Sequence, residues 1–238
     1  MEAKESSTSM FKLSICVTVF ATIANSAMAA AKDDVGHRLK ESATVLSEVM
    51  AISDKSIPQD LLEKAHCIVI VPGLKKGAFI FGGKYGKGFI SCRGKGHTGW
   101  SAPGAVRIEG GSFGFQIGGS ESDVILLVLN ARGAERLLQS KFTVGAEGEV
   151  AAGPVGRDSS AQTDAKMTAE ILSWNRSRGL FAGISLQGAT LREDKEDNRL
   201  LYGSPMKNSE IVEKWQAPTA EAQALLELLK KYSPKELN

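Results

Sequence analysis

Basic side chains gather in one stretch of the chain, and they are the residues whose type and spacing most directly suggest chemistry. Residues 64–108 contain no Asp or Glu, although the whole chain has a formal net charge of only +2. A local positive potential attracts anions even when net charge is small. We expect one exposed cationic face that contacts phosphate groups through Lys75, Lys76, Lys84, Lys87, Arg93 and Lys95.

Charge alone leaves two classes of anionic partner open. Lysines close to an anionic bilayer contribute about 1 kcal/mol of binding free energy each, so several together can hold a small domain on a membrane. Aromatic residues among the lysines, such as Phe81, Tyr85 and Phe89, are equally suited to stacking on single-stranded nucleic acid. A merely solvated surface is the default for exposed lysines, and the length of the acid-free stretch argues against it here.

Two glycine-rich motifs match catalytic or cofactor signatures by letter but not in context. Residues 94–99 (GKGHTG) fit a dinucleotide fingerprint, but Pro103 would interrupt the helix that must follow. Ser112 (GGSFG) fits a nucleophile elbow, but another glycine-rich strand follows it and all three histidines precede it. The cysteines and histidines lack metal-ligand spacing. We therefore expect no catalytic residues, no metal and no cofactor.

The amino terminus has the features of a secretory signal peptide. Residues 13–24 are apolar but too few to span a bilayer comfortably, and Ala27-Met28-Ala29 has the small-x-small pattern of a cleavage site. We expect a signal peptide over residues 1–29, a single domain over residues 30–238, and a periplasmic or secreted location with peripheral membrane association. An uncleaved anchor is the alternative, because Glu2 and Glu5 offset the nearby lysines.

Cys67 and Cys92 remain after removal of the leader, and both fall in strand-like segments. A disulfide between them would contribute on the order of 3 kcal/mol to stability. Two buried thiols that behave as small hydrophobic side chains are an equally good interpretation. The sequence does not decide between these states.

Helical periodicity is confined to the two ends of the chain. Apolar residues recur every three or four positions over Val35–Met50, which predicts an amphipathic helix that packs on a sheet, with peripheral membrane insertion as the alternative. A short helix is expected over Gln59–Lys64, where Pro58 lies in the first turn. A terminal helix is expected over Ala220–Tyr232.

The middle of the chain reads as short strands joined by glycine-rich turns. A buried strand is expected at Cys67–Val71, followed by a hairpin whose strands, Gly77–Gly82 and Gly88–Arg93, flank a turn at Gly83–Lys87. Glycines inside strands mark bulges, bends or close approach, so the sheet should be strongly curved. The expected fold is α+β: a curved, barrel-like, mostly antiparallel, glycine-rich sheet flanked by N- and C-terminal helices.

A series of segments, correctly ordered along the chain, resembles the SYLF domain family, also called the Ysc84 actin-binding domain, and especially its secreted bacterial lipid-binding members. The resemblance gives a family-like core over about residues 35–203 and a helical C-terminal extension over residues 204–238. The segments are CIVIVP (67–72), GAFIFGGKYGKG (77–88), GWSAP (99–103), GGSFGFQIG (110–118), DVILLVLN (123–130), AAGPVGR (151–157), SRGLFAG (177–183) and Tyr202-Gly203.

The resemblance implies non-catalytic binding of anionic phospholipids, including phosphoinositides for eukaryotic relatives. Val35–Met50 matches the segment associated with membrane binding in those relatives, and Arg157, Arg176 and Arg178 lie in family motifs, where they could contact phosphate or cap buried carbonyls. Actin bundling belongs to eukaryotic members and is not carried over. The expected partner is an anionic phospholipid membrane and not nucleic acid. The alternative is a cell-envelope scaffold or protein-interaction module without lipid specificity.

Overall fold

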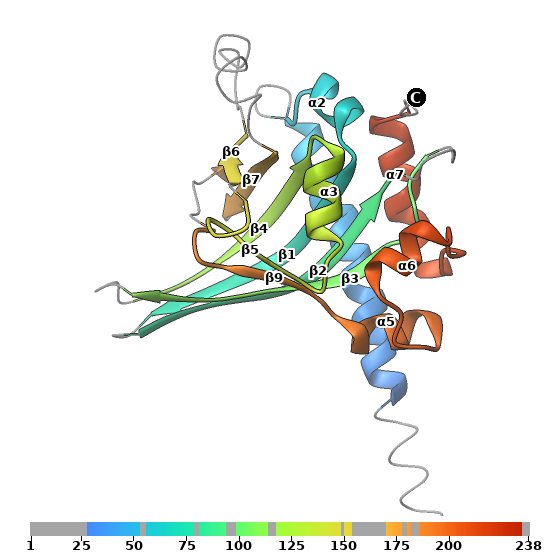
Figure 1. Ribbon diagram of the computed structural model, residues 1–238, viewed down its shortest axis with the longest axis horizontal. Coiled ribbons are helices and arrows are strands. Elements are labelled where there is room, and N and C mark those ends of the chain that lie inside the picture. Colours follow the sequence, from blue (N-terminus) through green and yellow to red (C-terminus); the bar gives the residue numbers. More distant parts are fainter. Residues whose placement is uncertain are drawn as a thin grey trace, which may run out of the picture.

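The fold is built on a strongly curved, nine-stranded sheet with helices packed against it (Figure 1). The computed structural model describes residues 28–52, 56–78, 81–93, 99–113, 118–148, 150–153, 170–177, 180–181 and 186–234. Within these residues all strand pairings are antiparallel except that of β6 with β7. The expected α+β fold, with a curved sheet between N- and C-terminal helices, is confirmed.

The strands follow the order β5-β9-β3-β2-β1-β4-β7-β6, with β8 paired to β7. They comprise β1 (Cys67–Ala78), β2 (Phe81–Cys92), β3 (Gly104–Phe113), β4 (Gly118–Val128), β5 (Lys141–Thr143), β6 (Val150–Ala152), β7 (Ile171–Ser177), β8 (Leu180–Phe181) and β9 (Thr190–Glu193). A helix over residues 28–51, the N-terminal helix, precedes them. The other helices are α2 (Gln59–Lys64), α3 (Ala131–Leu137), α5 (Lys195–Tyr202), α6 (Asn208–Glu213), the short 3-10 helix η1 (Ala220–Ala222) and α7 (Gln223–Tyr232).

Hydrophobic side chains alternate between two cores, one on each face of the sheet. Ile68 and Ile70 of β1 pack with the N-terminal helix, α2 and α7, whereas Val69 and Val71 pack on the opposite face with residues of α3, α6 and β9. This alternation follows from the two-residue period of a strand. The sheet is therefore buried on both sides along its central strands.

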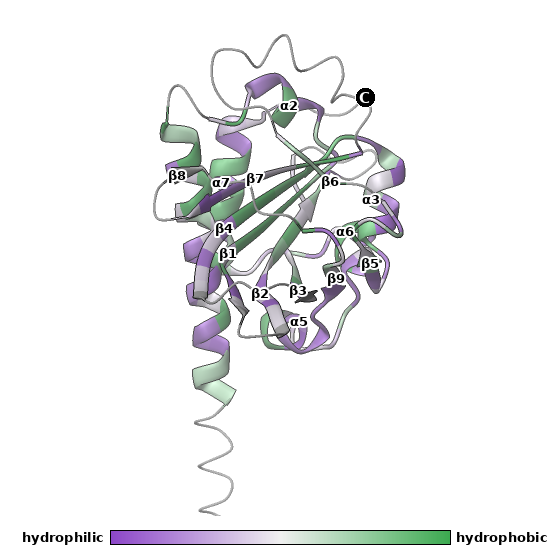
Figure 2. Ribbon diagram, turned by 90° about the vertical axis from the view of Figure 1, so that its left-hand side faces the viewer, coloured by the Kyte–Doolittle hydropathy of each residue, from purple (hydrophilic) through white to green (hydrophobic). Residues whose placement is uncertain are grey.

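The N-terminal helix packs on the sheet with its apolar side. Leu39 and Leu46 of this helix are fully buried in the same core as Leu225 of α7. Figure 2 shows the N-terminal helix and α7 against the strands. The predicted packing of the helix on the sheet is confirmed, and its apolar stripe is already covered by protein. None of the helices in the described ranges is long and apolar enough to cross a bilayer.

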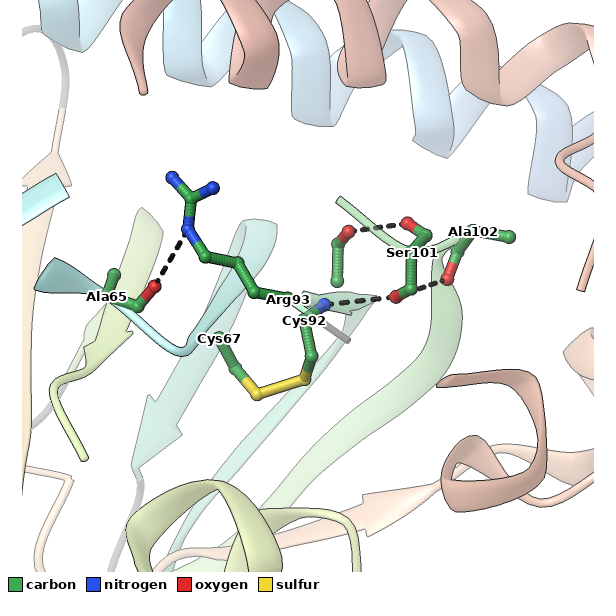
Figure 3. The surroundings of a disulfide bond; sticks show 7 residues. Ala65, Cys67, Cys92, Arg93, Ser101 and Ala102 are labelled. Carbon is green, nitrogen blue, oxygen red and sulfur yellow. Dashed lines mark hydrogen bonds between the residues drawn. A yellow bond between two sulfur atoms is a disulfide. The ribbon is translucent and has the colours of Figure 1, made fainter. Parts of the chain in front are cut away.

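Cys67 and Cys92 form a disulfide between paired positions of β1 and β2 (Figure 3). Of the two states that the sequence left open, the structure contains the disulfide. Next to the bridge, Ser101 Oγ accepts a hydrogen bond from the Cys92 backbone N–H and donates to the Ala102 carbonyl. These bonds satisfy buried polar groups at the end of β2.

The hairpin turn expected at Gly83–Lys87 is not a turn, because this segment lies inside β2. The connection between β1 and β2 falls at residues 79–80, outside the described residues. A Cβ placed on Gly88 would lie 2.0 Å from the Ile70 carbonyl oxygen, and one on Gly86 would lie 2.8 Å from Leu74 Cδ1. These glycines let β2 approach the irregular part of β1, so they mark close contact and not a turn.

The four central strands extend past the helices as an arm (Figure 1). We use this name for residues 74–78, 81–86, 109–113 and 118–122 of β1 to β4. Four glycines lie in register across the arm, in the order Gly119, Gly77, Gly83 and Gly111. A Cβ on any of the last three would meet nothing within 4 Å. Unlike Gly88, they make room for no neighbouring atom.

Replacing Gly88 by alanine should therefore destabilise the fold, because its methyl group would overlap the β1 backbone. We expect a loss of about 3 kcal/mol in the free energy of unfolding. Gly83→Ala, in the same strand but with open space at its Cβ, is the matched control and should change the free energy little. Urea unfolding followed by circular dichroism measures both, and equal losses would contradict the close-approach explanation.

Candidate functional site

An open groove of about 1390 Å³ lies between the N-terminal helix and the base of the arm. One side of the helix lines it, with positions spaced by three or four residues. β1, β2, β4 and β7 supply the rest of the lining. The helix contributes His37, Lys40, Glu41, Thr44 and Glu48 among others.

Buried ion pairs hold one end of this groove together. Lys87 Nζ of β2 lies 2.9 Å from carboxylate oxygens of both Asp194 and Asp197. Arg38 Nη1 of the N-terminal helix lies 2.7 Å from Asp197 Oδ2. The two aspartates are 1% and 4% exposed. Because three elements meet here, the network fixes the helix, the sheet and α5 relative to one another.

The pKa values show which effect dominates in this network. Burial opposes ionisation of Asp194, but the hydrogen bond from Lys87 and the backbone N–H of Asp197 outweigh it and lower the pKa of Asp194. Burial likewise disfavours the charge on Lys87, yet its hydrogen bonds to both aspartates raise its pKa. Lys87 is thus a firmly charged partner of two carboxylates, and the expectation that it stands on a face free of acids does not hold.

A second set of ion pairs crosses the groove farther along. Arg176 Nη2 of β7 lies 2.8 Å from Asp123 Oδ2 of β4 and also pairs with Glu48 of the N-terminal helix. The guanidinium therefore joins the helix to the sheet. For Arg176 the expected roles were contact with a phosphate or capping of buried carbonyls. Its role in the structure is structural, but its partners are carboxylates and not carbonyls. Arg157 and Arg178 lie outside the described residues.

Arg93 lies away from the groove and is only 8% exposed. Its Nε donates to the Ala65 carbonyl (Figure 3), and its Nη2 donates to the Ser233 carbonyl at 2.9 Å and to Ser233 Oγ. The guanidinium also lies 4.5 Å from the ring centroid of Trp100. Arg93 thus ties the residue after α7 to the residue after α2, and it is not part of an exposed cationic face.

The remaining predicted lysines are divided between the two faces of the arm. Lys75 is opposite Tyr85 in the β1–β2 register, and both are exposed on the groove side. Lys76 also borders the groove, but it is opposite Lys84 in the register, and strand alternation directs the side chains of this pair to the other face. Lys84 is buried, and its burial together with the charge of Lys76 lowers its pKa. Lys95 lies outside the described residues. The expected single cationic face is therefore split.

Lys40 is a groove residue that the sequence argument missed. It is exposed on the polar side of the N-terminal helix and lines the same groove as Lys75. Neither lysine forms an ion pair with any carboxylate in the described part of the chain. The signal in the sequence is the position of Lys40 on the polar stripe of an amphipathic helix, far along the chain from the acid-free stretch.

The family model Ysc84, described as "Las17-binding protein actin regulator", matches residues 109–232. SH3 domain-containing YSC84-like protein 1 is 33% identical over 205 residues in both Rattus norvegicus and Homo sapiens, covering 82% of this chain and 59% and 58% of those proteins. LAS seventeen-binding protein 3 of Saccharomyces cerevisiae is 36% identical over 155 residues, 63% of this chain and 33% of that protein. The chain thus spans about three-fifths of the first two relatives. Their names describe binding or domain-containing proteins and no enzyme.

Removing the cation of the buried network should both weaken the fold and change its acid sensitivity. Lys87→Met should lower the free energy of unfolding by about 3 kcal/mol at neutral pH, because it leaves buried carboxylates without a partner. With its lowered pKa, Asp194 contributes stability above the ordinary aspartate pKa and loses it as the pH falls through the folded value. Without Lys87 the pKa of Asp194 is lowered less, so Lys87→Met should lose less stability on acidification, and its deficit relative to the unmodified chain should shrink as the pH falls.

The urea concentration at the unfolding midpoint, measured for Lys87→Met and for the unmodified chain at about five pH values between pH 2 and 7, tests this prediction. Lys75→Met, in the neighbouring strand, is the matched control. The control should stay within about 0.5 kcal/mol of the unmodified chain, since Lys75 is exposed. A Lys87→Met profile parallel to that of the control would show that the ion pairs do not govern acid stability.

Proposed function

The chain belongs to the Ysc84 (SYLF) domain family, and from this premise we propose that it binds anionic phospholipid membranes without catalysing a reaction. The observation that carries the proposal is the position of Lys75 and Lys76 on an arm that extends past the helices (Figure 1). Cations at the projecting end of a domain reach a flat surface before the rest of the molecule does. The protein would bind peripherally, with the arm toward the headgroups.

The attraction is electrostatic and therefore depends on salt and lipid charge. Each lysine near an anionic surface contributes about 1 kcal/mol, and the contribution falls off within a Debye length. Tyr85, which is 50% exposed beside Lys75, adds an amphipathic ring suited to the headgroup region. Lys87 and Arg93, which are held by carboxylates and carbonyls, take no direct part in this version of the site.

Charge reversal on the arm tests the proposal. Lys75→Glu/Lys76→Glu should reduce co-sedimentation with vesicles of phosphatidylcholine and phosphatidylserine at least tenfold (a rough value from about 1 kcal/mol per lysine). Lys214→Glu/Lys230→Glu alters two exposed lysines outside the arm by the same total charge and should have a much smaller effect. Binding by the unmodified chain should rise with the anionic fraction and fall with added salt. Equal binding to neutral vesicles at every salt concentration would refute the proposal.

A location in the periplasm or outside the cell forms part of the same proposal and rests on the signal-peptide prediction for residues 1–29. Residues 1–27 lie outside the described residues. Mass spectrometry of the protein isolated from its host should find an amino terminus at Ala30, in the envelope or secreted fraction. A chain that retains Met1 and fractionates with the cytosol would contradict this location.

Protein binding is the second candidate, and the names of the relatives favour it. The yeast relative is named as a LAS seventeen-binding protein, and the family description names actin regulation. In this alternative the chain is a scaffold or interaction module, and its lysines keep the arm soluble. A defined protein that co-purifies with the unmodified chain, together with vesicle binding that Lys75→Glu/Lys76→Glu leaves unchanged, would favour the second candidate over the first.

A further inference from the structure

We propose that the N-terminal helix takes part in headgroup binding while it stays docked on the sheet, by presenting Lys40 across the groove from Lys75. This inference rests on the proposed function. It assigns the binding contribution of the helix to its polar side and not to its apolar side. The lipid phosphate would lie in the groove between a helical lysine and a strand lysine, with the Tyr85 ring beside them.

The two sides of the helix have different surroundings. Its apolar stripe is committed to the core, where Val35 is 1% exposed and Leu39 and Leu46 are 0% exposed. Its polar stripe, which includes Lys40 and Thr44, is exposed and lines the groove. Insertion of the apolar stripe into a bilayer would require the helix to leave the core, whereas the polar stripe is accessible without any rearrangement.

Several contacts oppose release of the helix. Arg38 pairs with the buried Asp197, and Glu48 pairs with Arg176. At Gly36 the helix lies so close to η1 that a Cβ there would be 3.2 Å from Glu221 Cγ. Undocking would break both ion pairs and expose the core to water. The docked state is therefore the one in which a groove ligand meets this helix.

Among the basic residues that line the groove, Lys40 and Lys75 are the two best placed to bind a phosphate. Arg38, Lys87 and Arg176 each have carboxylate partners, so an incoming phosphate would have to compete with these. Lys76 also borders the groove, but strand alternation directs its side chain to the other face of the arm, opposite Lys84. Within the described ranges, Lys40 and Lys75 have no ion pair and remain available. These two lysines come from different elements, so a phosphate between them would be held from both sides.

Four carboxylates in the described part of the chain line the groove, and they limit its attraction for an anion. Glu48 and Asp123 pair with Arg176, and Glu41 lies beside His37, which leaves Glu121 next to Lys75. Glu121 of β4 is opposite Lys75 in register, but its side chain extends over Gly73, where a Cβ would lie 2.7 Å from Glu121 Oε1. It forms no ion pair with Lys75 in the described structure, yet it lines the groove and repels an anion. Neutralising Glu121 should therefore strengthen binding, which is the opposite of the effect of neutralising Lys40.

The first experiment uses neutral substitutions and vesicles containing phosphatidylserine. Lys40→Gln should weaken binding about fivefold, the loss expected for one lysine near an anionic surface. Lys32→Gln removes an exposed lysine of the same helix that does not line the groove and should weaken binding less than twofold (about the limit of the assay, since the charge is remote). Glu121→Gln should strengthen binding. Equal effects of the two lysine substitutions would overturn the inference.

The second experiment locks the helix in place. Cβ atoms at positions 36 and 221 would be 3.9 Å apart, which is within the range of a disulfide, so Gly36→Cys/Glu221→Cys should form a bridge. Cys16→Ser in the background prevents mispairing. Because Glu221 also interacts with the charge of Lys40, the single Glu221→Cys variant is the control for the lost carboxylate.

The bridged protein should bind vesicles as well as the Glu221→Cys control, and Lys40→Gln should still weaken it. Loss of binding in the bridged form would show that the helix must leave the sheet, which overturns the inference and leaves the proposed function intact. If Lys75→Glu/Lys76→Glu also has no effect, the proposed function itself fails. Should the bridged variant not fold, the opposite signs expected for Lys40→Gln and Glu121→Gln still decide.

Discussion

The buried ion pairs around Asp197 set the geometry on which the rest of the molecule depends. Lys87 and Arg38 approach this carboxylate from a strand and from the N-terminal helix, while the backbone of α5 carries it. Asp194 caps the same helix by accepting a hydrogen bond from the Asp197 backbone N–H. A charge that is removed from water is stable only with good partners, so the three elements are held together with little freedom. The groove has its shape because this junction is rigid.

The same network determines which cations are available to a ligand. A basic residue that neutralises a buried carboxylate cannot be displaced without exposing that carboxylate to an apolar interior. Cations in the groove therefore divide into structural ones, such as Lys87, and solvent-facing ones, such as Lys75. Counting lysines along the sequence overestimates the attractive charge, because acids far away in the chain fold back against some of them.

Helices whose residue pattern depends only on neighbouring positions could be predicted from the sequence. The helix at Gln59–Lys64 and the periodic N-terminal helix depend on neighbouring residues only. The pairing of Lys87 with Asp197 joins residues 110 positions apart, which no window of sequence contains. Helix α5 did carry a readable signal, with Asp194 as N-cap, acidic residues in its first turn and Gly203 in the left-handed conformation after its end. The turn predicted at Gly83–Lys87 was wrong because a turn and a close contact between strands both favour glycine.

The row of glycines across the arm gives the sheet a crease. Along the line from Gly119 to Gly111 there are no side chains to stack from strand to strand, so bending there is resisted mainly by backbone hydrogen bonds. This line is therefore where we expect the arm to bend most easily, while the packed strands on the other side keep their register. Gly77 and Gly119 also line the groove, so bending along this line would change the width of its mouth while both hydrophobic cores stay packed.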